Sequence, residues 1–266
     1  MPRFKIPYGP HEQQFGHLYV PDGVADGTAA GAAHGPIPIV MQIHGGFWSG
    51  QYGLNLGTAF AVELARHGVA VWNIEYRRLG AGGGWPEMSA DVKTAYDEIP
   101  GLVAAKSSAE FDLNQVCLLG HSAGGHLAVW LAGEKGTFAR PERVIAQAAA
   151  LDLASAGERG RRISFIEDLF GVPFDADPDL YRSASPQHRL PIGVPVVCVT
   201  GAQDLQVPAK VSSRYAKAAE AAGDPVALRV IEGEGHDAFL SPSTESWQVS
   251  RELVLAEDPL ALITSD

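Results

Sequence analysis

The chain has few cysteines, no long apolar run and no cluster of positive charge. Among its 266 residues only Cys117 and Cys198 are cysteines, and each lies in a different apolar run. Strands that are not neighbours hold thiols too far apart for a disulfide, so we expect two buried free thiols. No apolar run reaches the ~20 residues that span a bilayer, and the N-terminal segment lacks the apolar centre of a secretory signal. We therefore expect a cytoplasmic protein that does not enter a membrane.

The charge and the missing motifs exclude several other classes of function. The formal net charge is −11 and there is no basic stripe, which argues against nucleic acid as a partner. There is no H-E-x-x-H, no paired C-x-x-C and no Asp-rich calcium loop. The glycine-rich stretch at 80–84 lacks the Lys-Ser/Thr ending of a phosphate-binding loop. The sequence therefore predicts neither a metal nor a cofactor.

Apolar runs typical of buried strands alternate with segments of helical spacing along most of the chain. This alternation predicts an α/β fold with a mostly parallel central sheet and helices on both faces. We expect one domain over residues 1–266. Residues 154–191 break the alternation and are rich in proline and aromatic residues, so they are a candidate cap or lid insertion over the active site. The expected strands are 15–20, 39–43, 69–74, 116–119, 144–151, 196–200 and 226–231, and the expected helices are 58–67, 89–99, 124–131, 209–222 and 244–255.

Residues 120–124 read Gly-His-Ser-Ala-Gly, directly after the apolar run 115–119 and before a helix-like segment. This is the sequence form of a nucleophile elbow, in which a strand turns sharply into a helix and Ser122 stands at the strained tip. Gly120 and Gly124 suit the close approach of strand and helix. We therefore predict Ser122 as a catalytic nucleophile.

A serine hydroxyl needs a base, and the base needs a carboxylate to orient it. His236 follows the last expected strand, and Asp204 follows the strand before it. The order Ser122, Asp204, His236 is the order that this elbow type uses. Asp152, which also follows an expected strand, is the alternative acid, and Asp204 is preferred.

The tetrahedral intermediate needs hydrogen-bond donors for its oxyanion. One is the backbone N–H of Ala123, after the nucleophile, and the others come from the His-Gly-Gly-Phe stretch at 44–47. Gly45, Gly46 and Phe47 are the predicted donors, since glycine lets backbone N–H groups face a ligand. We expect structural roles for the histidines at 44, 121 and 126.

The substrate pocket is predicted to be apolar and aromatic. Loops at the carboxyl ends of the strands and the 154–191 insertion supply the aromatic side chains that can reach a site there. Together with Phe47, the predicted substrate-binding residues are Trp48, Trp85, Phe165, Phe170 and Phe239. The insertion is short and carries arginines, unlike the apolar lid of an interfacial lipase, so short acyl groups are expected.

Several motifs together resemble the α/β-hydrolase fold and its HGG-bearing esterase branch. They are His-Gly-Gly-Phe-Trp at 44–48, Glu-Tyr-Arg-Arg-Leu at 75–79, Trp-Pro at 85–86 with Asp91, and Gly-His-Ser-Ala-Gly-Gly-His at 120–126. Within this branch they look most like the kynurenine formamidase-like and feruloyl-esterase-like carboxylester hydrolases, over about residues 37–250. The resemblance implies cofactor-free hydrolysis of esters or aryl formamides through an acyl-enzyme, and it leaves the substrate open.

The predicted function is that of a serine carboxylesterase acting on small esters. An arylformamidase acting on N-formylkynurenine-like substrates is the alternative, because the same acyl-enzyme chemistry serves both. A catalytically silent binding protein of the same fold is the alternative from another class. The expected partner is a small-molecule ester or formamide, and homo-oligomer formation is left open.

Overall fold

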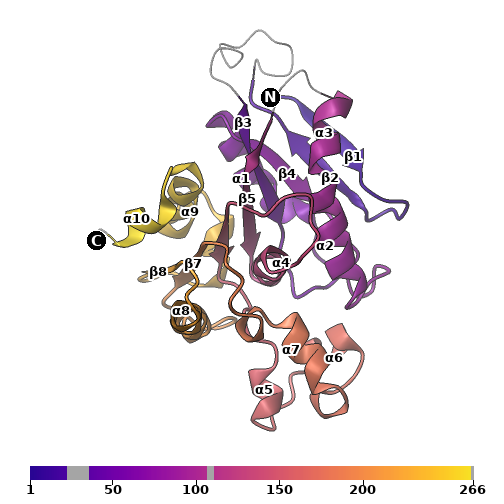
Figure 1. Ribbon diagram of the computed structural model, residues 1–266, viewed down its shortest axis with the longest axis vertical. Coiled ribbons are helices and arrows are strands. Elements are labelled where there is room, and N and C mark those ends of the chain that lie inside the picture. The colour runs from indigo at the N-terminus through magenta and orange to yellow at the C-terminus, as the bar shows by residue number, and fades with distance from the viewer. Residues whose placement is uncertain (23–35, 107–110, 265–266) are drawn as a thin grey trace.

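A computed structural model describes residues 1–22, 36–106 and 111–264 of the chain. Within these residues the strands form one eight-stranded sheet in the order β1-β2-β4-β3-β5-β6-β7-β8 (Figure 1). β1 pairs with β2 and β2 with β4 in antiparallel fashion, and the other neighbours are parallel. The predicted mostly parallel sheet is confirmed. The strands are β1 (Arg3–Pro7), β2 (Phe15–Tyr19), β3 (Ile37–Ile43), β4 (Ala70–Ile74), β5 (Phe111–His121), β6 (Arg143–Gln147), β7 (Val196–Gly201) and β8 (Val226–Ile231).

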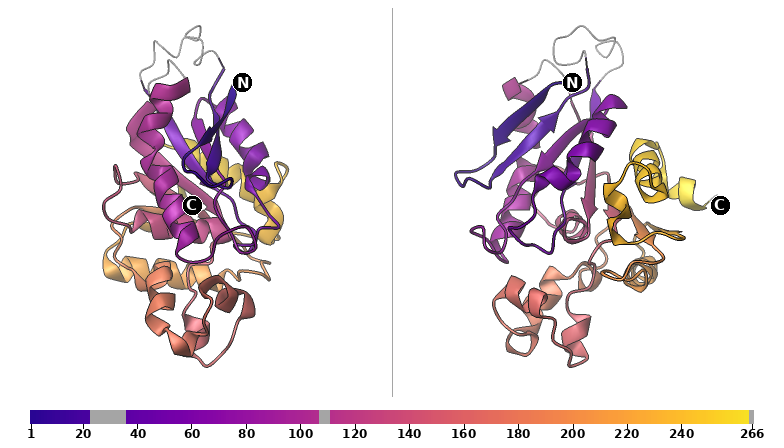
Figure 2. Two further views of the ribbon diagram at one scale, coloured as in Figure 1. Left: turned by 90° about the vertical axis from the view of Figure 1, so that its right-hand side faces the viewer. Right: turned by 180° about the vertical axis from the view of Figure 1, so that it is seen from behind.

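Helices connect the strands and lie on both sides of the sheet (Figures 1 and 2). The α-helices are α1 (Thr58–Arg66), α2 (Glu87–Asp97), α3 (Ile99–Lys106), α4 (Ala123–Ala132), α5 (Ser155–Glu158), α6 (Ser164–Phe170), α7 (Pro178–Ala184), α8 (Lys210–Ala222), α9 (Glu245–Leu255) and α10 (Pro259–Thr264). Short 3₁₀ turns are η2 (Leu54–Gly57), η3 (Phe174–Ala176), η4 (Pro186–His188) and η5 (His236–Leu240).

Two apolar clusters lie on opposite faces of the sheet. Successive side chains of a strand point to opposite faces. In β3, Met41 belongs to one cluster with side chains of α2, α4 and α8, while Val40 belongs to the other with side chains of α1 and α9. Because both faces of the sheet are covered, its central strands are mostly apolar, as is typical of parallel strands. The prediction of helices on both faces is confirmed.

The structure differs from the sequence-based expectation at several elements, of which three are informative. β1 was not predicted, because its charged and proline-bearing sequence is that of an edge strand whose side chains alternate in exposure. α2 begins at Glu87 rather than at Ser89, whose hydroxyl donates to the carbonyl of Pro86 within the first turn. β6 ends at Gln147, before Ala148 adopts a positive φ of 43°.

Both cysteines are buried and free. They lie on β5 and β7, which are separated by β6. The expectation of two unpaired thiols is therefore confirmed. None of the helices within the described residues is both long enough and apolar enough to cross a bilayer.

The segment between β6 and β7 contains α5, α6 and α7, which lie beyond the carboxyl ends of the parallel strands (Figures 1 and 2). In open α/β sheets the ligand sites lie at these strand ends. The loop after β3, the turn after β5 and the loops after β7 and β8 meet at the same edge. All predicted catalytic residues lie on these four connections.

Candidate active site

Ser122 lies in a strained turn between β5 and α4. Its backbone has φ 55° and ψ −116°, a conformation that costs energy for a residue with a Cβ atom. The flanking glycines leave room for this turn. A Cβ atom on Gly124 would lie 2.1 Å from the carbonyl oxygen of Ile43, and one on Gly120 would lie 2.3 Å from the carbonyl oxygen of Gly124. The observed geometry is that of a nucleophile elbow.

Asp204 and His236 form a buried hydrogen-bonded pair. Asp204 Oδ2 lies 2.7 Å from Nδ1 of His236. The other oxygen of Asp204 accepts backbone N–H groups from Gln206 at 2.9 Å and Val207 at 2.8 Å, which fixes the plane of the carboxylate. With Nδ1–H donating to Asp204, Nε2 of His236 is the basic nitrogen.

His121 links the loop of His236 to the elbow. Its Nε2–H donates to the carbonyl oxygen of His236 at 2.9 Å, and the centroids of the two rings are 4.7 Å apart. Burial, with a smaller contribution from His236, lowers the pKa of His121 to about 3. His121 is therefore neutral at physiological pH. It precedes Ser122 in the chain, and its hydrogen bond fixes the backbone of His236 relative to the elbow. A positioning role agrees with the structural role expected for it.

The alternative acid, Asp152, does not contact His236. Its carboxylate accepts the N–H of Ser155 at 2.9 Å and lies 3.7 Å from the guanidinium of Arg214 and 4.0 Å from the ring of His188. The structure thus brings Asp204, and not Asp152, to the histidine.

The loop after β3, in which the oxyanion donors were predicted, has an unusual backbone. Gly46 has φ 111°, and Phe47 and Trp48 both have φ 55°, which is rare outside glycine. A Cβ atom on Gly45 would lie 3.1 Å from Cβ of Ser122, so this loop runs directly beside the nucleophile. Within the described residues, the backbone N–H groups of Gly45, Gly46, Phe47 and Ala123 donate to no backbone carbonyl. Such unpaired N–H groups are suitable donors to an oxyanion.

A buried cluster of polar side chains, His44, Glu75 and Arg78, stabilises this loop through hydrogen bonds. His44 lies with Nδ1 2.7 Å from the carbonyl oxygen of Gly45 and Nε2 2.8 Å from Oε1 of Glu75. Arg78 also contacts Oε1 of Glu75, and the N–H of Leu54 donates to Oε2 at 3.1 Å. Burial alone would raise the pKa of Glu75, but the hydrogen bond from His44 and the charge of Arg78 hold it below its ordinary value of 4.5. Glu75 was not assigned a role from the sequence.

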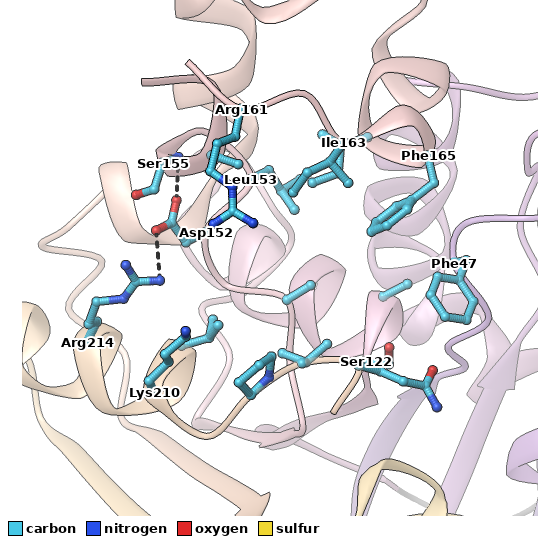
Figure 3. Close-up of a pocket in the computed structure, with 18 of the residues that line it drawn as sticks. Phe47, Ser122, Asp152, Leu153, Ser155, Arg161, Ile163, Phe165, Lys210 and Arg214 are labelled. Atoms are coloured by element: carbon cyan, nitrogen blue, oxygen red, sulfur yellow. Dashed lines mark hydrogen bonds and ion pairs between the residues drawn. The ribbon is translucent and has the colours of Figure 1, made fainter. Parts of the chain in front are cut away.

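A cavity of about 340 Å³ adjoins Ser122. Phe47, Trp48 and Phe165 line it, as predicted, and Phe165 is edge-on to Phe47 with ring centroids 5.7 Å apart (Figure 3). The insertion supplies one wall and the segment from Leu205 to Arg214 supplies another.

Three predicted pocket residues do not line this cavity, which corrects their assignment. Trp85 packs edge-on against Trp130, with ring centroids 5.1 Å apart, and its ring centroid lies 6.1 Å from that of Phe170. Phe170 is itself buried against Tyr181, and Phe239 is buried on the other face of the sheet. None of these three side chains belongs to the wall of this cavity, and each packs against other aromatic rings.

The sequence also left several wall residues unassigned. Lys210 and Arg214 lie on the first turns of α8, and Arg161 lies in the insertion. Their positions at the carboxyl edge of the sheet are the only sequence signal that could have pointed to them. Among the described residues, no group of three or more His, Cys, Asp or Glu side chains is placed to hold a metal ion.

Residues 28–218 match the BD-FAE family, and this segment is well over half of the chain. The chain belongs to the BD-FAE family. Two curated proteins are similar to this BD-FAE chain. Esterase LipC of Mycobacterium tuberculosis is 27% identical over 76% of the chain, and a probable isoprenylcysteine alpha-carbonyl methylesterase of Oryza sativa subsp. japonica is 26% identical over 87%. The chain spans 53% and 58% of the length of these two relatives.

Solved structures share the fold of this BD-FAE chain. Esterase 2 of Thermogutta terrifontis superposes with a TM-score of 0.74 at 19% identity, covering 94% of this chain and 89% of that one. A truncated carbohydrate esterase from gut microbiota superposes with a TM-score of 0.75 at 18% identity, covering 96% and 95%. With the sheet order and the two helical layers, this likeness shows the α/β-hydrolase fold.

Proposed function

We propose that the protein is a serine hydrolase that cleaves small carboxylic esters through an acyl-enzyme on Ser122. One observation carries the proposal. The carboxylate of Asp204, fixed by two backbone N–H groups, accepts a hydrogen bond from Nδ1 of His236 at 2.7 Å. The carbonyl oxygen of His236 in turn accepts a hydrogen bond from His121, which directly precedes the strained Ser122. A base, its orienting acid and an activated serine are the parts that nucleophilic ester cleavage needs.

The chemistry follows from these positions. Ser122 Oγ attacks the ester carbonyl while His236 Nε2 takes the hydroxyl proton, and Asp204 stabilises the imidazolium. The oxyanion accepts hydrogen bonds from the N–H of Ala123 and from N–H groups of the Gly45–Phe47 loop. The C–O bond to the alcohol then breaks, and His236 returns its proton to the leaving oxygen. Water, deprotonated by His236, attacks the acyl-enzyme and releases the acid and free Ser122.

The acyl group is expected to be short. A cavity of about 340 Å³ is at the lower end of ordinary ligand sites, which favours a short acyl chain over a long lipid chain. The similar Thermogutta terrifontis esterase 2 has been solved with propionate and with butyrate bound. The names of the similar proteins, an esterase and a probable methylesterase, support ester cleavage.

An arylformamidase uses the same chemistry, with formyl as the acyl group and an aryl amine as the leaving group. The triad therefore does not distinguish an esterase from an arylformamidase, and the substrate groups that the pocket accepts do. The direct comparison is a panel of p-nitrophenyl esters of two to sixteen carbons beside N-formylkynurenine. We expect the largest kcat/KM for a short-chain ester. A kcat/KM for N-formylkynurenine above that of every ester would assign the formamidase activity instead.

The nucleophile is tested by labelling and substitution. A fluorophosphonate probe should label Ser122 in the wild type and leave Ser122→Ala unlabelled, because only an activated serine reacts. The substitution should lower kcat by about 10⁶, as loss of a triad nucleophile does elsewhere, with an unchanged circular dichroism spectrum. Wild-type turnover in Ser122→Ala would overturn the assignment. A wild type without label and without turnover would identify a silent binding protein.

A further inference from the structure

The cavity beside Ser122 has two chemically different ends. Near Ser122 its wall is aromatic, with Phe47 and Phe165 facing each other (Figure 3). At the far end, Arg161 reaches in from the insertion and Lys210 reaches in from the start of α8 (Figure 3). These two cations come from segments about fifty residues apart and converge on one space.

The far end carries a surplus of positive charge. Four cationic side chains and one carboxylate belong to the wall, namely Arg159, Arg161, Lys210, Arg214 and Asp152. Asp152 is already engaged by Arg214 and by the N–H of Ser155. Within the described residues, Arg161 and Lys210 form no ion pair with a carboxylate. A concentration of cations in a chain of net charge −11 creates a local field that attracts anions.

This cavity lies on the acyl side of the reacting carbonyl. The leaving oxygen must be next to His236, which protonates it. Neither His236 nor Asp204 belongs to the cavity wall, whereas Ala123 and Phe47, two of the proposed oxyanion donors, do. A substrate whose carbonyl oxygen faces these donors and whose alcohol faces His236 places its acyl chain in the cavity, towards the cations.

We propose that the preferred acyl group ends in a carboxylate, so that the substrate is a half-ester of a short dicarboxylic acid. The proposal rests on the proposed esterase function and narrows it to a substrate class. The aromatic end holds the methylene chain, and Arg161 and Lys210 bind the free carboxylate through charge-assisted hydrogen bonds. Hydrolysis releases the alcohol and a dicarboxylate, with the atom balance of ordinary ester cleavage.

The first test compares matched substrates. Monomethyl esters of dicarboxylic acids from five to eight carbons are assayed beside the corresponding methyl ester amides, which have the same size but no charge. At the best chain length we expect the half-ester to show a kcat/KM about tenfold higher, the usual gain from a hydrogen bond to a charged group. The preference should shrink as salt is raised, because the cations are solvent-exposed.

The second test removes the cations. The double variant Arg161→Gln and Lys210→Gln should bring the ratio of kcat/KM for half-ester over amide towards one. The matched control is Arg162→Gln with Lys217→Gln, which removes one cation from the same loop and one from the same helix. Neither Arg162 nor Lys217 belongs to the cavity wall, and Arg162 is bound to Glu167 at 2.6 Å. The control should keep the wild-type ratio.

The outcomes separate this proposal from the proposed function. If the amide ester is hydrolysed and Ser122 is labelled but the half-ester is not preferred, the carboxylate proposal is wrong and the esterase stands. If neither substrate is hydrolysed and Ser122 is unlabelled, the esterase itself is wrong. A preference that appears only when the carboxylate is on the alcohol, as in 6-acetoxyhexanoate against its amide, would overturn the acyl-side placement.

Discussion

The indole N–H of Trp48 donates to Nδ1 of His126 at 3.2 Å. On the other side of the ring, Nε2–H of His126 donates to the carbonyl oxygen of Ala184 at 2.8 Å. One neutral imidazole thus connects the oxyanion loop, the helix that follows the elbow, and the insertion. The two hydrogen bonds of His126 therefore link the backbone of the insertion at Ala184 to Trp48 in the loop beside Ser122.

The buried His126 should make stability depend on pH. Burial lowers its pKa from 6.5 to about 4. Below pH 6.5 the unfolded chain binds a proton that the folded chain does not accept until about pH 4. The contribution of the neutral ring is therefore complete above pH 6.5 and is lost as the pH falls from 6.5 to about 4. In His126→Gln, the slope of the unfolding free energy with pH in this window should fall by about 1.4 kcal/mol per pH unit, because one fewer proton is taken up on unfolding. Equal slopes in urea denaturation of both proteins would contradict this.

The acid of the triad is tested by two asparagine substitutions. Asp204→Asn should lower kcat by about 10⁴, because an amide holds the wrong tautomer of His236. Asp152→Asn should lower kcat less than about tenfold, since Asp152 contacts Ser155, His188 and Arg214 and not the base. Steady-state assays of both variants on the best short-chain ester give the ranking. The reverse ranking would assign the role to Asp152.

Gly45 is a sensitive point of the oxyanion loop. An added Cβ atom would lie 2.6 Å from the carbonyl oxygen of His121 and 3.1 Å from Cβ of Ser122, so the loop must move away from the nucleophile. We expect Gly45→Ala to lower kcat by about 10²–10³, as loss of one oxyanion donor does. Gly84→Ala is the control, since its Cβ atom would meet its nearest neighbour at 3.6 Å. Equal kcat values for the two variants would show that the loop is not close to the reacting carbonyl.

Glu75 should be important for stability. Its side chain binds the ring of His44, the guanidinium of Arg78 and the N–H of Leu54 in a buried setting. Glu75→Ala leaves the Arg78 charge without this partner, and breaking a buried pair in this way costs about 3–5 kcal/mol. Urea denaturation measures the loss, with the exposed Glu252→Ala as the control at close to zero. A loss below about 1 kcal/mol would mean that Arg78 finds another partner.

The local parts of the site could be predicted from the amino-acid sequence. The elbow at 120–124 and the glycine pair at 45–46 could be predicted because tight turns depend on glycine and on a strand directly before them. The positions of Asp204 and His236 after apolar runs also placed both at the carboxyl edge, because parallel strands end there together. These features depend on a few residues that are adjacent in the chain.

Which distant side chains lie close together could not be predicted, because it depends on how the elements pack. Asp152 and Asp204 both follow strands, and the pairing with His236 depends on how the loops after β7 and β8 pack. Trp85 and Phe165 are both aromatic residues at the same edge, yet only Phe165 faces the cavity. The placement of Arg161 and Lys210 on the wall of one cavity likewise depends on how the insertion packs relative to α8. Such contacts join segments far apart in sequence, and their distances are set by sheet order and packing, which short motifs do not encode.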